Sequence, residues 1–113
     1  MPAEDHIQLA RASYGAYETG DRAAIEALIA DDFTFWSPQD DGIDRATYLE
    51  RCWPNHKHLA RFEFKRLHDL GGGEVLVTYE AERTDGARFR NTEVLTFDGG
   101  RLTRAEVYFG WNL

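Results

Sequence analysis

The sequence is poor in cysteine and has no long apolar run. Its single cysteine allows no disulfide within the chain, and no apolar stretch approaches the ~20 residues of a membrane-spanning helix. The first residues, Met1 to His6, lack the basic start and the apolar stretch of a secretory signal peptide. We therefore expect a cytoplasmic protein with no membrane as a partner.

Positive charge is also scarce. The chain has 13 Lys and Arg against 20 Asp and Glu, a formal net charge of −7, and no basic stripe. This balance argues against nucleic acid as a partner. A glycine-rich phosphate loop, a nucleophile elbow and a zinc motif are missing as well, so neither a nucleotide cofactor nor a metal is expected.

The residues that are present predict one globular domain over residues 1–113, because 42% are hydrophobic and 13% aromatic. Ile7, Ala10, Tyr14 and Tyr17 recur at steps of three and four residues, which predicts a helix that ends near Gly20.

Two more helices are predicted before residue 55. Asp21 is the expected N-cap of the second, and Asp44 of the third, which Pro54 should end. Between them, residues 33–37 read as a short strand that runs into a Ser-Pro turn. The acidic residues Asp40 and Asp41 are interpreted as surface.

From residue 58 onward the apolar period changes to two. Strands are predicted from there to the glycines at 71–73, from Val75 to the Asp85 turn, and on both sides of the turn after Asp98. Four such strands make an antiparallel meander, and only the three helices can cover its apolar face. The fold class is α+β.

The last hairpin raises a question about a carboxylate. Asn91 and Glu93 share one strand face with Phe89 and Leu95. A two-residue turn at 98–99 would pair this face with the polar face of the last strand. A three-residue loop ending in a left-handed glycine would pair it with the apolar face that includes Val107. We favour the second, because it joins the two more apolar faces.

Two stretches resemble a known superfamily. "YGAYETGDRAAIEALIADDFTFWSP" is similar to the opening of the nuclear transport factor 2-like proteins, and "FRNTEVLTFDGGRLTRAEVYFGW" to their last hairpin. The superfamily includes ketosteroid isomerase, scytalone dehydratase, limonene epoxide hydrolase, SnoaL-like polyketide cyclases and proteins without catalysis. The resemblance, which covers nearly the whole chain, implies a SnoaL-like domain with a cystatin-like cone around a deep apolar pocket, often in a homodimer.

The resemblance to ketosteroid isomerase carries over only in part. The position matching Glu93 is an aspartic acid at the base of that enzyme's pocket, which implies an inward Glu93. The position of its general base is Ser37 here, and that of its oxyanion tyrosine is Ser13, with Tyr14 one residue later. Steroid isomerisation is therefore not expected, and the Asp, Arg, Asp set of an epoxide hydrolase is not seen at matching places.

The candidate catalytic residues are Glu93, as acid or base, with Asn91 and Tyr14 to orient a carbonyl or enolate. For each, a solvated rim or a core position is the plain alternative. His56, Asp32 or a water could serve as the second acid or base, and the His56 and His58 spacing is only a weak metal signal. The candidate ligand-binding residues are Tyr17, Trp36, Trp53, His56, Phe62, Tyr79, Phe109 and Trp111.

Three hypotheses follow from this pattern. The chain is a cofactor-free isomerase, lyase or cyclase for a small apolar, oxygen-bearing molecule, or a module that binds such a molecule without chemistry, or a dimerising accessory domain. The outer sheet face, which mixes apolar residues with Arg104 and glutamates, predicts a homodimer through the sheet.

Overall fold

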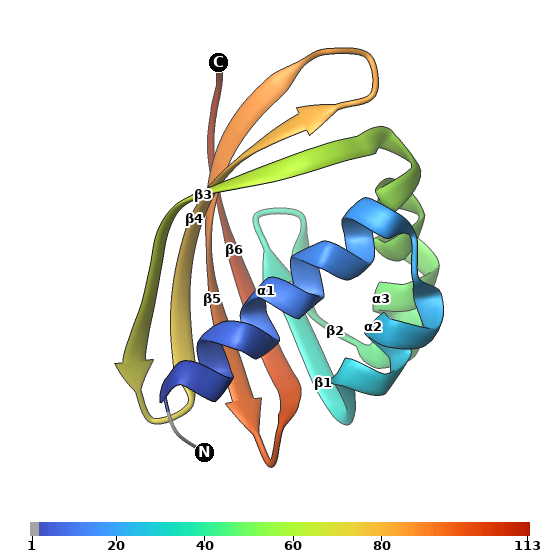
Figure 1. The fold of residues 1–113 in the computed structure, drawn as a ribbon. Helices are drawn as coiled ribbons and strands as arrows, with labels where there is room; N and C mark the ends of the chain where they lie inside the picture. Colours follow the sequence, from blue (N-terminus) through green and yellow to red (C-terminus); the bar gives the residue numbers. More distant parts are fainter. Residues whose placement is uncertain (1–2) are drawn as a thin grey trace.

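A computed structural model describes residues 3–113, with side chains from His6 onward. Helices lie against one face of a curved six-stranded sheet (Figure 1), so the predicted α+β class is confirmed. The elements in chain order are α1 (Ala3–Thr19), α2 (Arg22–Leu28), β1 (Ile29–Ser37), β2 (Asp40–Asp44), α3 (Arg45–Arg51), the 3-10 helix η1 (Trp53–His58), β3 (Leu59–Gly71), β4 (Glu74–Arg83), β5 (Arg88–Asp98) and β6 (Arg101–Asn112).

The helix boundaries follow the predicted caps. Helix α1 is followed by Gly20 at φ 69°, a conformation that glycine adopts without strain. The Asp21 carboxylate accepts from the Ala24 amide at 3.1 Å, and Asp44 accepts from the Thr47 amide at 2.9 Å. Each cap satisfies a backbone donor that its short helix would otherwise leave free.

The sheet has the strand order β2-β1-β6-β5-β4-β3. Strands β3 to β6 form the predicted antiparallel meander, but β1 runs parallel to β6, so the sheet is mixed rather than wholly antiparallel. Strand β1 follows the second helix, and it joins the sheet beside the last strand. This long-range pairing leaves no signature in a local pattern.

The acidic segment after Pro38 forms a strand. Asp41 is exposed as expected, whereas the side chain of Asp40 is largely buried. Asp40–Asp44 forms β2 and pairs with β1 through Ser37 opposite Asp40, with a bulge beside Trp36. Ser37 Oγ donates to Asp40 Oδ2 at 2.9 Å, which helps to hold this two-residue connection. A short edge strand of aspartates has low strand propensity, so pairing with β1 decides its structure.

The register of the last hairpin places Glu93 opposite Val107, on the predicted face. The reason differs from the expected one. Gly99 and Gly100 form a two-residue turn with φ of 60° and 80°. A bulge lies between the pairs Phe97–Leu102 and Thr96–Arg104, and its extra residue shifts the register so that Glu93 faces Val107. A left-handed glycine in this hairpin is thus confirmed, whereas the three-residue loop is wrong.

The core lies between the helices and the concave face of the sheet. Ile25, Phe33, Val77 and Leu95 are almost fully buried there. No helix of the described residues is long and apolar enough to cross a membrane.

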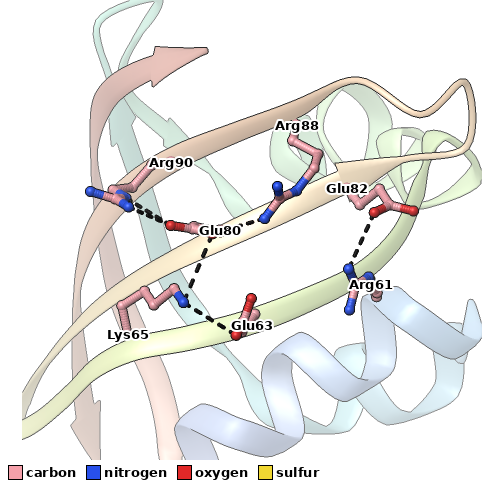
Figure 2. A network of polar contacts seen from close by, with 7 residues as sticks. All are labelled: Arg61, Glu63, Lys65, Glu80, Glu82, Arg88 and Arg90. Carbon is pink, nitrogen blue, oxygen red and sulfur yellow. Dashed lines mark hydrogen bonds and ion pairs between the residues drawn. The ribbon is translucent and has the colours of Figure 1, made fainter. Parts of the chain in front are cut away.

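The outer face of the sheet is open and charged. Glu80 is only 8% exposed there, because cationic side chains cover it (Figure 2). Arg88 Nη2 lies 3.0 Å and Arg90 Nε 3.2 Å from its carboxylate, and Lys65 Nζ lies 3.9 Å away. The hydrogen bond from Arg90, followed by the charges of these cations, lowers the pKa of Glu80, so it is ionised at neutral pH.

Candidate functional site

A cavity of about 260 Å³ opens between the helices and the concave sheet face. Helix α1 supplies Tyr14 and Tyr17 to its wall, and α3 supplies Tyr48. Strand β4 supplies Tyr79 and β5 supplies Glu93, both of which point inward because of their register. The cavity is slightly smaller than the about 300 Å³ at which drug-sized pockets begin, which suits a small ligand.

Glu93 is held by a chain of hydrogen bonds across the sheet. Tyr79 Oη donates to Glu93 Oε2 at 2.7 Å, and Asn91 Nδ2 donates to Tyr79 Oη at 3.4 Å. The amide oxygen of Asn91 in turn accepts from the Gly110 backbone N–H at 3.0 Å. The carboxylate and the amide therefore have fixed orientations before any ligand arrives.

Burial dominates the chemistry of Glu93. Desolvation raises the pKa of this carboxyl to about 7, although the hydroxyl groups of Tyr79 and then Tyr14 act in the opposite direction. A carboxyl group with this pKa is part protonated and part ionised at neutral pH. It can therefore both give and take a proton without a large energetic barrier.

Tyr14 brings an unsatisfied donor to the same place. Its ring packs edge-on against Phe62, with centroids 5.1 Å apart. Its buried hydroxyl is near enough to Glu93 to lower the pKa of that carboxyl, but within the described residues it makes no hydrogen bond of normal geometry. Burial and, next, the nearby Glu93 charge raise the pKa of Tyr14 well above its usual value. The hydroxyl thus remains protonated, and a ligand oxygen could accept its hydrogen bond.

A second pair of tyrosines lines another part of the wall. The hydroxyl groups of Tyr17 and Tyr48 are hydrogen-bonded to each other. Burial raises the pKa of Tyr48 above its usual range and that of the neighbouring Cys52 thiol to about 11. Neither group is ionised at neutral pH, so this part of the cavity can offer hydrogen bonds but no nucleophile.

Asp40 adds a second carboxylate, which the sequence interpretation had placed on the surface. It lines the cavity with a side chain only 10% exposed, and Arg51 Nη2 lies 3.1 Å from its Oδ1. The two residues first considered as the second acid or base do not line the cavity. His56 packs on Trp53 at a centroid distance of 4.5 Å, and Asp32 is exposed.

Four predicted ligand-binding residues do not line the cavity. Trp53 and His56 stack behind its wall, and Trp36 lies under the Arg104 guanidinium at 4.7 Å. Trp111 was expected beside Phe109, but a bulge at Gly110 reverses its side, so it pairs with Arg90 and is 60% exposed.

The remaining predicted residues do lie in the wall, and some wall residues were missed. Tyr48, on the apolar side of the third predicted helix, lines the wall but was not among the predicted site residues. No signal in the sequence distinguishes a stripe that fills a core from one that borders a cavity. The predicted residues in the wall are Tyr14, Tyr17, Phe62, Tyr79, Asn91, Glu93 and Phe109.

Within residues 3–113, no group of three His, Cys, Asp or Glu side chains is arranged to hold a metal ion. The H-x-H spacing of His56 and His58 therefore gains no third ligand from the fold. Both residues lie in η1, outside the cavity wall.

Solved structures with the same architecture come from several bacteria. A candidate ketosteroid isomerase from Kribbella flavida is 23% identical, with a TM-score of 0.79 over 95% of this chain and 78% of that one. An LEH-like epoxide hydrolase from M. tuberculosis is 21% identical, with a TM-score of 0.77 over 95% and 84%. A candidate polyketide cyclase from Xanthomonas campestris is 18% identical, with a TM-score of 0.75 over 95% and 91%. Identities this low establish the fold alone.

No curated protein sequence matches the chain. The SnoaL-like domain family, in contrast, matches residues 10–105, which include α2, α3, strands β1 to β5 and Glu93. The chain therefore belongs to the SnoaL-like domain family.

Proposed function

We propose that the cavity binds a small, largely apolar molecule with a carbonyl or hydroxyl oxygen, and that Glu93 exchanges a proton with it. The observation that carries this proposal is the position of the Glu93 carboxyl, hydrogen-bonded to Tyr79 in a cavity otherwise walled mainly by aromatic and aliphatic side chains. A carboxyl group in such surroundings is a poor choice for stability, and convergent polar groups in an apolar pocket mark a site.

The proton transfer would use side chains of this chain alone. Ionised Glu93 takes a proton from a carbon next to the ligand carbonyl, and the electron pair moves to the carbonyl oxygen to give an enolate. The free Tyr14 hydroxyl donates a hydrogen bond to that oxygen. Return of the proton to another carbon gives an isomer, whereas loss of a leaving group gives a lyase product.

Asp40 is the proposed partner for reactions that need a second acid or base. It reaches the same cavity from β2, and Ser37 and Arg51 hold its two oxygens. Two carboxyl groups in different surroundings can take opposite roles in one reaction. Glu93 is surrounded by apolar groups and tyrosines, whereas Asp40 has a cationic neighbour.

A binding module without chemistry is the second candidate. One observation favours it: Tyr79 already donates to Glu93, so the carboxyl could serve only to fix the tyrosine wall around a ligand. The two candidates differ in whether proton exchange occurs at the ligand.

Deuterium exchange separates these candidates. The protein is incubated with 2-tetralone in D2O, and the loss of the proton signals next to the carbonyl is followed by NMR. We expect exchange above the buffer rate, which Glu93→Gln returns to background because an amide cannot take the proton. Glu74→Gln, which removes a carboxylate at the start of β4, is the matched control and should leave exchange unchanged.

The outcomes have distinct meanings. Ligand-induced shifts of Tyr79 and Glu93 signals without exchange would favour the binding module. Neither shifts nor exchange with 2-tetralone and a panel of small ketones would contradict the proposed function as a whole.

A further inference from the structure

The mouth of the cavity carries a cation that the proposed chemistry does not use. Arg83 lies at the end of β4 and belongs to the cavity wall. Of the described residues that form this wall, Arg83 is the one Lys or Arg. Its side chain is exposed, so its guanidinium stays hydrated and available to an incoming group.

The strand register aims Arg83 at the cavity. Tyr79, Ala81 and Arg83 lie on the same side of β4, because side chains alternate along a strand. Tyr79 contacts the Glu93 carboxyl, and Ala81 is buried opposite Phe62 and Phe89. Arg83 is therefore the next inward position beyond a small, apolar stretch of wall.

The neighbouring arginines are engaged elsewhere, which distinguishes Arg83 from them. On the outer face, Arg61 pairs with Glu82 at 3.3 Å and Arg88 pairs with Glu80 at 3.0 Å (Figure 2). Within residues 3–113, the structure shows no ion pair or side-chain hydrogen bond for the Arg83 guanidinium. An arginine at a cavity mouth with five free donors is suited to a planar carboxylate.

We propose that Arg83 forms an anion-binding subsite, so that the ligand carries its reacting carbonyl or hydroxyl at one end and a carboxylate at the other. This inference rests on the proposed function and adds the class of molecule. Four residues of strand separate Tyr79 from Arg83, about 13 Å between their Cα atoms. The apolar part of the ligand, which joins its carbonyl or hydroxyl to its carboxylate, would lie along Ala81, Phe62 and Phe89. It would be somewhat shorter than the distance between the two Cα atoms, because the arginine side chain extends toward the carboxylate.

Two matched probes test the subsite. 9-Oxodecanoate and decan-2-one share a methyl ketone and chain length, and they differ in a terminal carboxylate against a terminal methyl. Dissociation constants are measured by NMR titration of the protein amides. We expect the wild-type chain to bind 9-oxodecanoate about five- to tenfold more tightly, the range of a charge-assisted pair at a partly solvated site.

Three variants identify the source of that preference. Arg83→Gln should bring the two dissociation constants together, and Arg83→Lys should keep most of the difference. Arg101→Gln, at the β5–β6 turn, makes the same change in net charge outside the cavity wall and should keep the full preference. Because each variant is compared across two probes, a general loss of folding would weaken both probes alike.

Equal affinity for the two probes in the wild-type chain would overturn the anion subsite and leave the proposed function standing. A preference that survives Arg83→Gln would overturn the role of this residue. Binding of neither probe would also overturn the inference, and deuterium exchange of 2-tetralone would then decide separately whether the proposed function fails with it.

Discussion

At the scale of single residues, the fold sets the charge of Glu93 by limiting its contact with water. Its folded pKa is raised from 4.5 to about 7, so ionisation opposes folding. The penalty is absent below the unfolded pKa, grows as the pH rises through it, and is complete above the folded pKa. A difference of this size corresponds to a free energy of up to about 3 kcal/mol.

Glu93→Gln should therefore stabilise the chain at pH 8 and change little at pH 4, because the amide is neutral at every pH and can still accept from Tyr79. Urea unfolding of both proteins at both pH values measures the difference in free energy of unfolding. Other titrating groups are common to the two proteins and cancel. The same difference at pH 4 and pH 8 would show that Glu93 is ionised without penalty, against the idea of a desolvated carboxyl.

The sequence predicted those wall residues that lie on regular strands, and it failed where a bulge or a long-range strand pairing decides the direction of a side chain. The inward positions of Glu93, Asn91 and Tyr79 follow from the alternation of side chains along β4 and β5. Asp40 could not be found this way, because its inward position depends on β2 pairing with β1. Trp111 was misplaced because one bulge at Gly110 reverses every side chain after it.

At the scale of elements, the β5–β6 turn is the connection that the register of Glu93 depends on. Gly99 has φ 60°, and a Cβ atom built there would meet no atom within 4 Å. The cost of a substitution is therefore conformational rather than steric. Gly99→Val should destabilise the fold by about 2 kcal/mol, and Gly99→Asn by less, since asparagine tolerates this region better than a β-branched residue.

Urea unfolding of the two Gly99 variants against wild type gives these values. Equal costs for valine and asparagine would contradict a left-handed residue at this position. The dihedral signs were predictable, because two adjacent glycines between strands mark a tight turn. The bulges were not predictable, since an extra residue in one strand is recognised only against its partner.

At the scale of the whole molecule, we propose that two copies associate through the outer sheet face. Tyr108 is 54% exposed there, near partly buried Val94 and Leu76. The expected cross-pairing of Arg104 with a glutamate of the partner is less favourable than it seemed from the sequence, because Arg104 Nε already lies 3.3 Å from Glu106 of its own chain. Apolar contact would then drive association, with a weak dependence on salt.

Sedimentation at micromolar concentration tests this assembly. We expect a dimer for the wild-type chain and a monomer for Tyr108→Glu, which would bury a charge in the interface. Leu70→Glu is the matched control, because Leu70 is similarly exposed at 51% but lies near the β3–β4 turn. A wild-type monomer would rule out the homodimer, and dissociation by both variants would move the interface away from Tyr108.

The parallel pairing of β1 with β6 has a consequence for how the chain acquires its shape. Ile29 pairs with Leu102, so this contact closes a loop that contains most of the molecule. Closing so long a loop costs chain entropy before the contacts between β1 and β6 stabilise the chain, and this slows folding. On a ribosome, β3 to β5 can pair as they emerge, but β1 has no neighbour on that side until β6 is made. The cavity, whose wall includes residues of both β1 and β6, is then among the last parts to form.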